Sequence, residues 1–572
     1  MTAISNNQQQ TGPESRAAQH AEQQPGDLLR SLLEESRQLT AVERFAKAHD
    51  EGEPELASHY RDLIPLSAPG EGEQYAFEVD LDACSGCKAC VSACHHMNGL
   101  DPGETWRAVG QLYGANGLPI IQHVTTACHH CVDPGCLNGC PTNAYEKDRE
   151  TGIVRHLDDQ CFGCQYCTMA CPYEVPQYSP SKGIVRKCDM CHSRLSEGEA
   201  PACVQACPNE AIKISVVSVA DAKAKAAAGE FLPSSPPPEL TKPTTIYRGE
   251  RPLPASLRAA DADHIAPQHA HLPLVFMLVL TQASVGAVAT GAVARWAGYE
   301  ASAAGAMIAG TLAGLFGLAL APLHLGRPHL AFRSVLGWRH SWLSREAIVF
   351  GLYAPLAIGA AALAAMPWLR PIADPYLPAA VGGLLDSAIA FRAPIATELL
   401  AVLSGAAAVF CSAKIYQFTG RAFWLGWRTG AKFAGTAVVL GLSLMLAAAA
   451  AAEYAAGITS PLSLLIGAVT VATIVKLVYE ATTLNARTNH SLALSSRLMT
   501  GQLQGPTVAR FVAGGLGGVL LPVAVAACGV GSLAAAVLAV ASFGLLLVGE
   551  LLERYLYFAA VVPLRMPGGV KS

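Results

Sequence analysis

The stretch CSGCKACVSAC at residues 84–94 places four cysteines in a C-x2-C-x2-C-x3-C run and decides how the first half of this chain must fold. Three similar quartets follow, so that sixteen of the eighteen cysteines lie between Cys84 and Cys207. The quartets are Cys84, Cys87, Cys90 and Cys94; Cys128, Cys131, Cys136 and Cys140; Cys161, Cys164, Cys167 and Cys171; and Cys188, Cys191, Cys203 and Cys207.

Spacing of this kind is typical of cysteines that bind cubane iron-sulfur clusters. Proline follows Cys140, Cys171 and Cys207, as it does where the fourth cysteine leaves its own loop to bind a neighbouring cluster. Disulfides and structural zinc are the alternatives. The first 25 residues lack the apolar core of a secretory signal, which favours a reducing compartment, and three cysteines within seven residues suit a tetrahedral ion poorly. The quartets therefore predict iron-sulfur clusters.

The sequence around the quartets divides into segments of different composition. Residues 1–73 form a polar tail with one amphipathic helix predicted at about 27–48, which packs either on a partner subunit or on the chain's own cluster domain. Residues 74–219 form the cluster domain, with strands predicted at YAFEVDLDAC and at AIKISVV. Residues 220–269 begin as a helix and become proline-rich, which predicts a strap over that domain, or else a free linker.

Residues 270–572 hold most of the alanine, leucine and valine of a chain that is 51% hydrophobic and 15% charged. Eight apolar stretches are each long enough to cross a hydrocarbon core of roughly 30 Å. We therefore predict eight transmembrane helices, at about 272–294, 301–323, 346–368, 393–415, 430–452, 460–482, 508–530 and 533–557. Glycines at 514–518 indicate close helix packing.

Basic residues are unequally divided between the two ends of these helices. The side of the cluster domain carries fourteen, and the opposite side carries Arg295, Arg370 and Arg392. The fourteen are Arg327, Arg333, Arg339, Arg345, Lys414, Arg421, Arg428, Lys432, Arg487, Arg497, Arg510, Arg554, Arg565 and Lys571. The positive-inside rule predicts a multi-pass protein of a bacterial inner membrane, with the cluster domain in the cytoplasm. The net charge of -4 and the lack of a basic patch give no indication of nucleic acid binding.

The chain resembles the iron-sulfur and membrane anchor subunits of the dimethyl sulfoxide reductase family, joined in one polypeptide. On the soluble side the likeness rests on CSGCKACVSAC, CFGCQYCTMACPYEVPQY and KCDMCHSRLSEGEAPACVQACPNEAI. On the membrane side it rests on LHLGRPHLAF, SWLSRE and GELLERYLYF. It implies an α+β, ferredoxin-like multi-cluster domain followed by an all-α bundle of eight transmembrane helices.

The resemblance also implies how the cysteines are shared among four [4Fe-4S] clusters. It joins Cys84, Cys87 and Cys90 with Cys207; Cys188, Cys191 and Cys203 with Cys94; Cys128, Cys131 and Cys136 with Cys171; and Cys161, Cys164 and Cys167 with Cys140. No ligand position of the family has been lost in this sequence.

An anchor of this kind exchanges electrons with a quinol, and its site needs a group that titrates near neutral pH. His324 stands at the cluster-facing end of the second predicted helix, and in the family the histidine of this HLG motif is associated with quinol binding. Arg327, His329, Arg345 and Glu346 lie in or beside the same loop and are further candidates. An interfacial histidine without a ligand is the alternative for His324.

Further polar groups near the cytoplasmic helix ends are interpreted mostly as interfacial anchors that extend toward water. They are Tyr416, Lys476, Glu480, Glu550 and Arg554. We expect no b-type haem, because the histidines after residue 300 lie near one face only.

The resemblance implies a non-catalytic subunit of anaerobic respiration that passes electrons between membrane quinol and a molybdopterin-containing catalytic subunit. The same parts run toward quinone in a sulfite-dehydrogenase-like complex, so the direction stays open. A cluster-coupled membrane transporter and a membrane-tethered ferredoxin without a quinone site are two competing hypotheses. The transporter predicts polar residues deep in several helices, and the sequence shows few of them.

Overall fold

The computed structural model describes residues 61–116, 118–373, 393–486, 489–529 and 531–569, together with Arg30. The predicted helix at 27–48 lies outside these residues, as do Arg392, Arg487 and Lys571 of the charge comparison. The chain divides into two units, Met1–Asp62 and Leu63–Ser572, and the fold described below is that of the second unit.

The cluster domain is organised around a sheet in which its first and last predicted strands pair. Strand β1 (Glu73–Asp80) is antiparallel to β8 (Ile212–Ser218), with Phe77 opposite Ile214, and parallel to β9 (Ile246–Arg248). The buried residues of β1 include Phe77 and Val79, whereas both of its end residues are exposed. Pairing of β1 with β8 therefore brings the two ends of the cysteine-rich region side by side.

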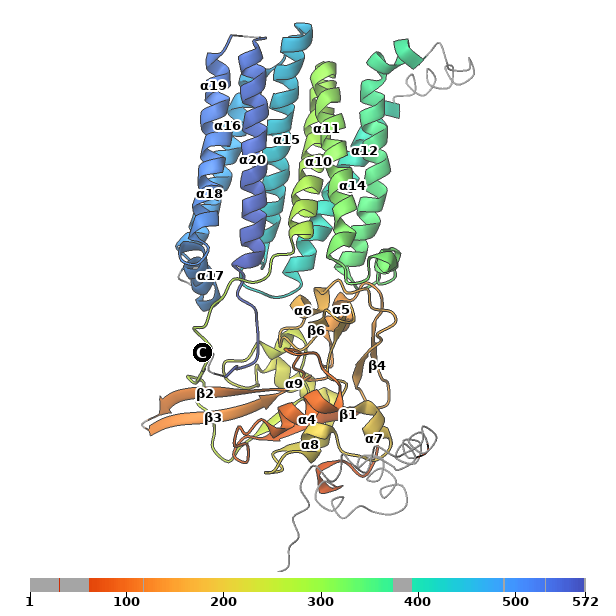
Figure 1. Cartoon of the computed structure of the whole chain (residues 1–572), viewed down its shortest axis with the longest axis vertical. Helices are drawn as coiled ribbons and strands as arrows, with labels where there is room; N and C mark the ends of the chain where they lie inside the picture. Colours follow the sequence, from red (N-terminus) through yellow and green to blue (C-terminus); the bar gives the residue numbers. More distant parts are fainter. Residues whose placement is uncertain are drawn as a thin grey trace, which may run out of the picture. The chain divides into compact units, whose positions relative to one another are not determined.

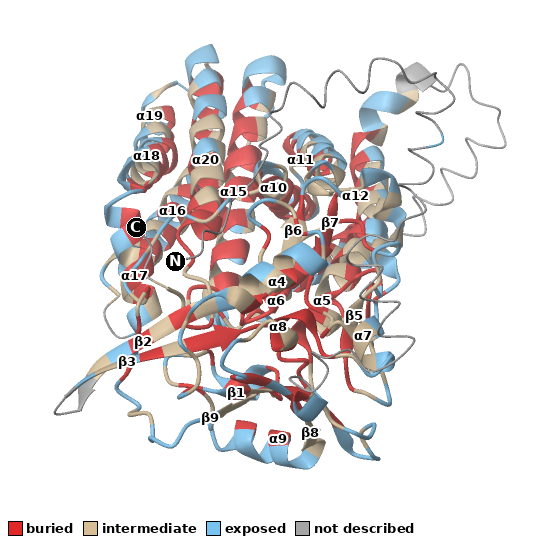
Figure 2. Ribbon diagram, turned by 60° about the horizontal axis from the view of Figure 1, so that its bottom comes forward, coloured by how far each residue is buried: buried red, intermediate tan, exposed pale blue. Residues whose placement is uncertain are grey.

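A second sheet contains the hairpin of β2 (Ala108–Asn116) and β3 (Leu118–Thr126), which projects from the rest of the domain (Figure 1 and Figure 2). Strand β10 (Arg258–Ala259) pairs with β2 on the other edge. The backbone N–H of Gln111 donates to the Gly568 carbonyl at 3.1 Å, so the C-terminal tail returns from the last membrane helix to this sheet.

Two short hairpins and six helices complete the domain around the cysteine loops. They are β4 (Tyr145–Lys147) with β5 (Val154–His156), β6 (Gln177–Ser179) with β7 (Ile184–Arg186), α4 (Ala89–Met97), α5 (Gly135–Gly139), α6 (Tyr166–Ala170), α7 (His192–Ser196), α8 (Ala202–Gln205) and α9 (Val219–Ala227). After α9 and the 3-10 turn η3 (Pro238–Leu240), the proline-rich segment contributes β9 and β10 to the two sheets. These two strands attach the segment to both sheets of the domain.

The described residues include the predicted eight helices that are long and apolar enough to cross a membrane (Figure 1). They are α10 (Leu272–Trp296), α11 (Glu300–Leu320), α12 (Trp342–Ala373), α14 (Ala393–Gln417), α15 (Trp427–Ala456), α16 (Leu462–Leu484), a seventh span made of α18 (Gln504–Gly515), η7 (Leu516–Leu520) and α19 (Leu521–Ala527), and α20 (Leu533–Ala559). The fold class predicted from the sequence is confirmed.

Helices α10 and α15 are the most buried spans, and they cross where two glycines meet. A Cβ atom at Gly286 would overlap the Ala437 carbonyl, and one at Gly441 would overlap the backbone of Gly286. The Thr290 hydroxyl donates to the Gly441 carbonyl at 3.2 Å across the same crossing. Small residues at a crossing let helix backbones approach closely, which strengthens their packing in lipid. This contact helps to join α10, α11, α12 and α14 to the remaining four spans.

The seventh span is not a regular α-helix, which its hydropathy does not show. Its π-helical turn η7 ends just before Pro522, which lacks the N–H group needed to continue an α-helix. A Cβ at Gly518 within this turn would overlap Thr473 of α16. The predicted glycine packing at 514–518 therefore includes a close contact with a neighbouring helix.

A further helix, α17 (His490–Thr500), precedes the seventh span and was not predicted. The Asn489 side chain caps it by accepting from the backbone N–H groups of Ser491 and Leu492. An asparagine in this position satisfies N–H groups that have no partner within the helix. The cap was a local signal that hydropathy alone overlooked.

The interpretation of Lys476, Glu480, Glu550 and Arg554 as anchors extending toward water was wrong. All four are buried among the last four spans, α15, α16, the seventh span and α20, which we call the second group of helices. Glu550 and Arg554 have no exposed surface. They belong to a set that we call the buried ion cluster, which contains Lys432, Lys476, Glu480, Arg510, Glu550, Glu553 and Arg554.

Paired charges hold this cluster together across four helices. Arg510 donates to Glu480 at 2.9 Å and to Glu550 at 2.8 Å, and Lys476 pairs with Glu550. Lys432 pairs with Glu553 at 3.1 Å. Charges in an apolar bundle are tolerated when they face its interior and pair, which the hydropathy of one helix cannot show.

We predict that Glu550→Gln destabilises the membrane half by about 3–5 kcal/mol, because it leaves the buried Lys476 and Arg510 with unbalanced charge. Thermal unfolding of the full chain in detergent should show a lower Tm than the native protein. The exposed Arg339→Gln is the control and should change stability by less than about 0.5 kcal/mol. Equal Tm values for Glu550→Gln and the native chain would contradict a stabilising role of the cluster.

Candidate functional site

The structure brings together cysteines from different quartets, in four sets whose thiols lie close enough to interact electrostatically. Group A contains Cys84, Cys87, Cys90 and Cys207; group B contains Cys94, Cys188, Cys191 and Cys203; group C contains Cys128, Cys131, Cys136 and Cys171; group D contains Cys140, Cys161, Cys164 and Cys167. This grouping is the one that the resemblance implies. That each group binds a cluster stays a prediction.

The loops that carry these cysteines turn tightly because some residues adopt the left-handed backbone conformation. Gly86 and Gly163, each the residue before the second cysteine of its loop, have φ angles of 74°. Glycine takes this conformation without the steric cost that a Cβ atom brings. Helices α4 and α6 then begin within two residues of the third cysteine, which turns the chain away from the group.

The thiol groups have the surroundings that a bound iron-sulfur cluster needs. The Gly163 N–H points at Cys161 Sγ at 3.4 Å, and the Ala211 N–H points at Cys207 Sγ at 3.3 Å. Such donors stabilise the negative charge of a ligating thiolate. The four cysteines of group A line one small cavity, and the four of group C line another.

The thiols of a group surround a space instead of converging on a point. Among the described residues, no three histidine, cysteine or carboxylate side chains are arranged to hold a single metal ion. A cubane cluster is larger than one ion, so its four thiolates stand further apart. The residues present therefore fit a cluster at these groups better than they fit zinc.

Burial raises the pKa of several of these thiols when no metal is bound. The pKa of Cys94 rises to about 12 because it is buried, and the nearby Cys203 raises it further while Arg107 lowers it. Burial likewise raises the pKa of Cys191 to about 11. Thiols of this kind become thiolates only when a metal takes the place of the proton.

The four groups follow one another in the order A, B, C, D. Cys90 of group A interacts with Cys203 of group B, and Cys188 of group B interacts with Cys128 of group C. The Tyr145 hydroxyl lies near thiols of both group C and group D. Group A is the most exposed, since Cys87 is exposed and two further members are only half-buried.

At the group D end of this row, a cavity of about 340 Å³ lies between the cluster domain and the membrane helices. Cys164, Tyr166 and Met169 line it from the cluster domain. Helices α10, α12 and α14 and the 3-10 turn η4 (Ala321–His324) line it from the membrane half. Its walls are mainly apolar, as expected of a site for a lipid-soluble molecule.

Two of the predicted site residues, His324 and Glu346, supply polar groups to this cavity. The Nδ1 atom of His324 hydrogen-bonds the Ala321 carbonyl, which requires Nδ1 to carry the proton and leaves Nε2 as an acceptor in the neutral ring. The Ser412 hydroxyl donates to Glu346, which is only 6% exposed. The cavity thus holds an imidazole acceptor and a buried carboxyl group.

The loop that begins with the HLG motif at residues 324–326 and ends before α12 is called the HLG loop. The other candidates, in or beside this loop, lie outside the lining of the cavity. Arg327 donates to the Asp158 carbonyl at 3.0 Å and so contacts the cluster domain. His329 is exposed, and Arg345 donates to backbone carbonyls of the turn that precedes α12. For these three residues a part in binding the occupant of the cavity stays a prediction without support from the geometry.

Glycines in the HLG loop let its backbone contact the backbone of the cluster domain. A Cβ atom at Gly326 would overlap the Gly183 carbonyl, and the N–H of Arg327 donates to Phe162 O at 3.0 Å. Gly337, in the turn that follows η5 (Pro328–Val335), donates to Pro141 O at 2.7 Å. These contacts place the group D loop at the wall of the cavity.

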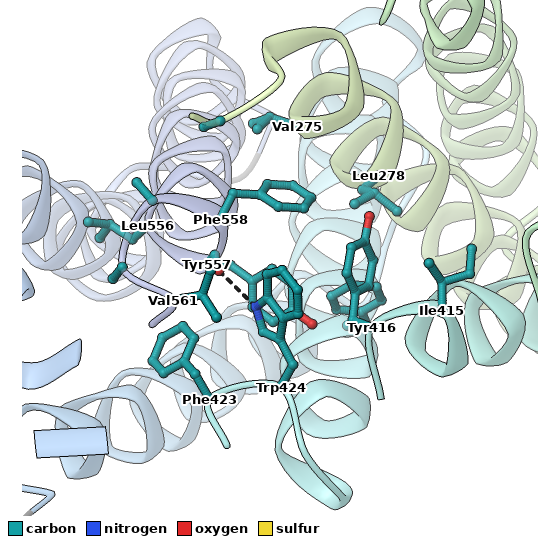
Figure 3. Close-up of a cluster of buried hydrophobic side chains, with 14 of the residues drawn as sticks. Val275, Leu278, Ile415, Tyr416, Phe423, Trp424, Leu556, Tyr557, Phe558 and Val561 are labelled. Atoms are coloured by element: carbon teal, nitrogen blue, oxygen red, sulfur yellow. Dashed lines mark hydrogen bonds between the residues drawn. The ribbon is translucent and has the colours of Figure 1, made fainter. Parts of the chain in front are cut away.

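An aromatic core supports the cavity from the side of the second group of helices (Figure 3). Trp424 donates through Nε1 to the Tyr557 carbonyl at 2.9 Å, and its ring stacks on that of Tyr557. Tyr416, which lines the cavity, meets the Tyr557 ring edge-on at 5.4 Å and points its hydroxyl toward Leu278 in Figure 3. Tyr166 ties the cluster domain to this core by donating to the carbonyl of the residue before Tyr416 at 2.7 Å.

Sequence reasoning missed Cys164, Tyr166 and Met169 as part of the cavity, and it treated Tyr416 only as a residue near a helix end. Nothing in the local sequence marks α6 as facing a membrane cavity. Its position depends on the contacts of the HLG loop, which lies more than 150 residues further along the chain.

Comparison with known proteins matches both halves of the chain to families. Residues 120–217 match the 4Fe-4S dicluster domain. Residues 267–560, more than half of the chain, match the family of the DMSO reductase anchor subunit (DmsC).

Curated relatives match the cluster domain. The probable anaerobic dimethyl sulfoxide reductase chain YnfG of Escherichia coli K12 is 41% identical over 149 residues, which are 24% of this chain and 72% of the relative. The thiosulfate reductase electron transfer subunit PhsB of Salmonella typhi is 39% identical over 145 residues, 24% of this chain and 74% of the relative. The hydrogenase-2 operon protein HybA of Escherichia coli O157:H7 is 35% identical over 160 residues, 23% of this chain and 49% of the relative.

We predict that cysteines of one group, rather than of one quartet, affect the same metal centre. Cys140→Ser and Cys164→Ser should alter the same EPR signal of the reduced protein, because both thiols belong to group D. Cys136→Ser should alter a different signal, although Cys136 and Cys140 share a quartet. Identical spectra for Cys136→Ser and Cys140→Ser would show that each quartet serves its own centre.

Proposed function

Because this protein belongs to the dimethyl sulfoxide reductase family, with an iron-sulfur subunit and a membrane anchor subunit joined in one polypeptide, we propose that it passes electrons between a membrane quinol and a molybdopterin-containing catalytic subunit. The observation that carries the proposal is the cavity beside group D. It is lined at once by Cys164 and by the polar groups of His324 and Glu346. A lipid-soluble reductant in this cavity would contact the last thiol group of the row.

We propose that groups A to D each hold one [4Fe-4S] cluster, which when bound accepts and releases single electrons. The chain's own part is to fix the order of the four groups between a cavity at one end and an exposed face at the other. Burial of group C and of most of group D keeps water from them, which limits side reactions along the row.

The cavity residues suit the oxidation of a quinol, which gives up protons together with electrons. A quinol hydroxyl can donate to His324 Nε2, since Nδ1 is engaged with Ala321. Glu346 offers a carboxyl group to the same space, held by Ser412. Both groups can accept a proton as the electrons leave, and both lie near the cluster-side end of their helices.

We propose that the catalytic partner docks near group A. Among the thiols that the structure describes, Cys87 alone is exposed, and it lies at the end of the row opposite the cavity. A centre close to the surface can exchange electrons with another protein, whereas a deeply buried one cannot. Named relatives belong to dimethyl sulfoxide and thiosulfate reductases, which supports a partner of that type.

We infer the sidedness of the membrane protein from its charges. Lys432, Arg510 and Arg554 are paired inside the bundle and carry no information about the side. Without them, eleven of the fourteen basic residues remain on the cluster side against three on the other. This bias supports a cytoplasmic cluster domain at a bacterial inner membrane.

Electrons can flow in either of two directions under this proposal. A reductase draws electrons from quinol, and a dehydrogenase-like complex delivers them to quinone. Both use the same cavity and the same row of groups.

We expect His324→Arg and Glu346→Gln to slow reduction of the clusters by a quinol analogue at least tenfold while dithionite still reduces them fully. Arginine fills the cavity with a permanent charge, and glutamine removes a proton acceptor. The measurement is low-temperature EPR of membranes that contain the full chain. His329→Arg is the matched control, because His329 is exposed and does not line the cavity.

Quinol reduction that is equally fast in the native chain and both cavity variants would refute the quinol site at this cavity. If quinol reduces none of the proteins, oxidation of dithionite-reduced clusters by added quinone replaces the assay. If quinone then oxidises the clusters of the native chain but not those of the two cavity variants, electrons flow from the clusters to quinone.

A second expectation concerns the seat of the HLG loop. Gly326→Val should slow quinol-driven reduction of the clusters. A side chain there pushes the HLG loop away from Gly183, and so moves the membrane side of the cavity away from Cys164. Gly467→Val is the control, since a Cβ at this helix position meets no atom of the described residues within 4 Å. Unchanged reduction kinetics in Gly326→Val would show that the close contact is not needed.

A further inference from the structure

Two cations, Arg107 and Lys187, are buried among the thiol groups, each only 2% exposed. Neither lies within ion-pair distance of a carboxylate among the described residues, whereas most buried cations are paired. The electron-transfer row described above does not require a cation at either position. Their charge is therefore unexplained by the rest of the fold.

Arg107 lies between groups A and B. Its Nη1 donates to the Thr125 hydroxyl at 3.1 Å, and that hydroxyl lies 3.6 Å from Cys90 Sγ of group A. Its charge also acts on Cys94 and Cys203 of group B. The guanidinium lies over the Phe77 ring at 4.6 Å, and among the described residues no oxygen atom accepts a hydrogen bond from its Nε or Nη2. The positive charge is thus not neutralised by a carboxylate.

Lys187 lies between groups B and C. Its ammonium group donates to the carbonyls of Val154 and Cys188, and the side chain lines the cavity formed by group C. It acts on Cys128 and Cys136 of group C as well as on Cys188 of group B. Asp189 is near it and offsets part of its charge.

A third buried cation in the same region shows the contrast. Arg186 precedes Lys187 and is also buried, but it pairs with Glu104 at 3.3 Å and donates to Asn98 O at 2.9 Å. The Asn98 side chain in turn approaches Cys94 Sγ of group B at 3.6 Å. The three cations therefore differ in neutralisation and not in burial.

A cluster gains one negative charge when it is reduced, and a cation that is not fully neutralised in a low-dielectric interior stabilises that charge. We propose that Arg107 and Lys187 raise the reduction potentials of the centres at groups A, B and C, and that group B, which faces both cations, is raised most by them. The inference rests on the proposed function, because it requires clusters at these groups.

The placement gives the row an electrostatic bias. Arg107 lies near the group A end of the row and Lys187 lies at its middle, whereas group D meets the partly exposed Arg327 of the HLG loop. Electrons are therefore favoured on the groups nearer the proposed partner. Arg107 and Lys187 act as positioning residues for charge and contact no substrate themselves.

The test is a redox titration of the full chain in membranes, followed by EPR. The signals are assigned to groups by their loss in single cysteine-to-serine variants. Arg107→Gln should shift the potentials of groups A and B to more negative values, and Lys187→Met should shift those of groups B and C. Group D is the internal reference and should stay within the error of the titration in both variants.

Conservative and matched variants separate charge from structure. Arg107→Lys and Lys187→Arg keep the charge, so the potentials of their groups should stay close to those of the native protein. If the two residues only stabilised the fold, these variants would shift the potentials as much as Arg107→Gln and Lys187→Met do. Arg186→Gln removes a buried cation that is already balanced, and should shift group B by less than Arg107→Gln does.

Equal shifts of all four groups, no shift in either charge-removing variant, or a larger shift in Arg186→Gln would overturn the proposal. If Arg107→Gln fails to assemble clusters, Lys187→Met and Lys187→Arg are compared instead. The proposal then requires a shift of groups B and C in Lys187→Met that is absent from Lys187→Arg. Absence of all iron-sulfur signals from the native chain would instead refute the proposed function itself.

Discussion

The close approach of backbone to backbone at the HLG loop is the contact on which the rest of the structure depends. Gly326 meets the loops of Gly163 and Gly183 where no side chain fits, and Gly337 meets Pro141 in the same way. These contacts involve the loops that carry the cysteines of group D. A Cβ atom at Gly326 would overlap the Gly183 carbonyl, so a larger residue there requires one of the two backbones to move. The cavity beside Cys164 lies next to this contact, since Phe162 and Leu325 line it.

The membrane half is divided between two tasks that its sequence does not distinguish. Helices α10, α12 and α14 line the cavity, with His324 and Glu346 as its polar groups. The second group of helices holds the buried ion cluster, whose charges are paired across helices. Because α10 crosses α15 at Gly286 and Gly441, the two groups of helices pack closely and support each other.

In the cluster domain, burial and charge work together. The thiols are buried in an interior where an electron added to a centre is costly unless a positive charge lies nearby. Arg107, Lys187 and the paired Arg186 place such charges at different degrees of neutralisation. The same interior excludes water and fixes the order of the groups from an exposed end to the membrane end.

The sequence by itself determined the cysteine motifs, the strands at both ends of the cluster domain and the eight spans, because spacing and hydropathy are local properties of the chain. It also pointed to His324 and Glu346, which flank one loop. Only the tertiary structure decided that Cys164 faces the cavity, that Arg327 contacts the cluster domain, and that Glu550 is buried among paired charges. Each of these depends on segments far apart in the sequence, and no periodicity within a segment records which distant surface will cover it.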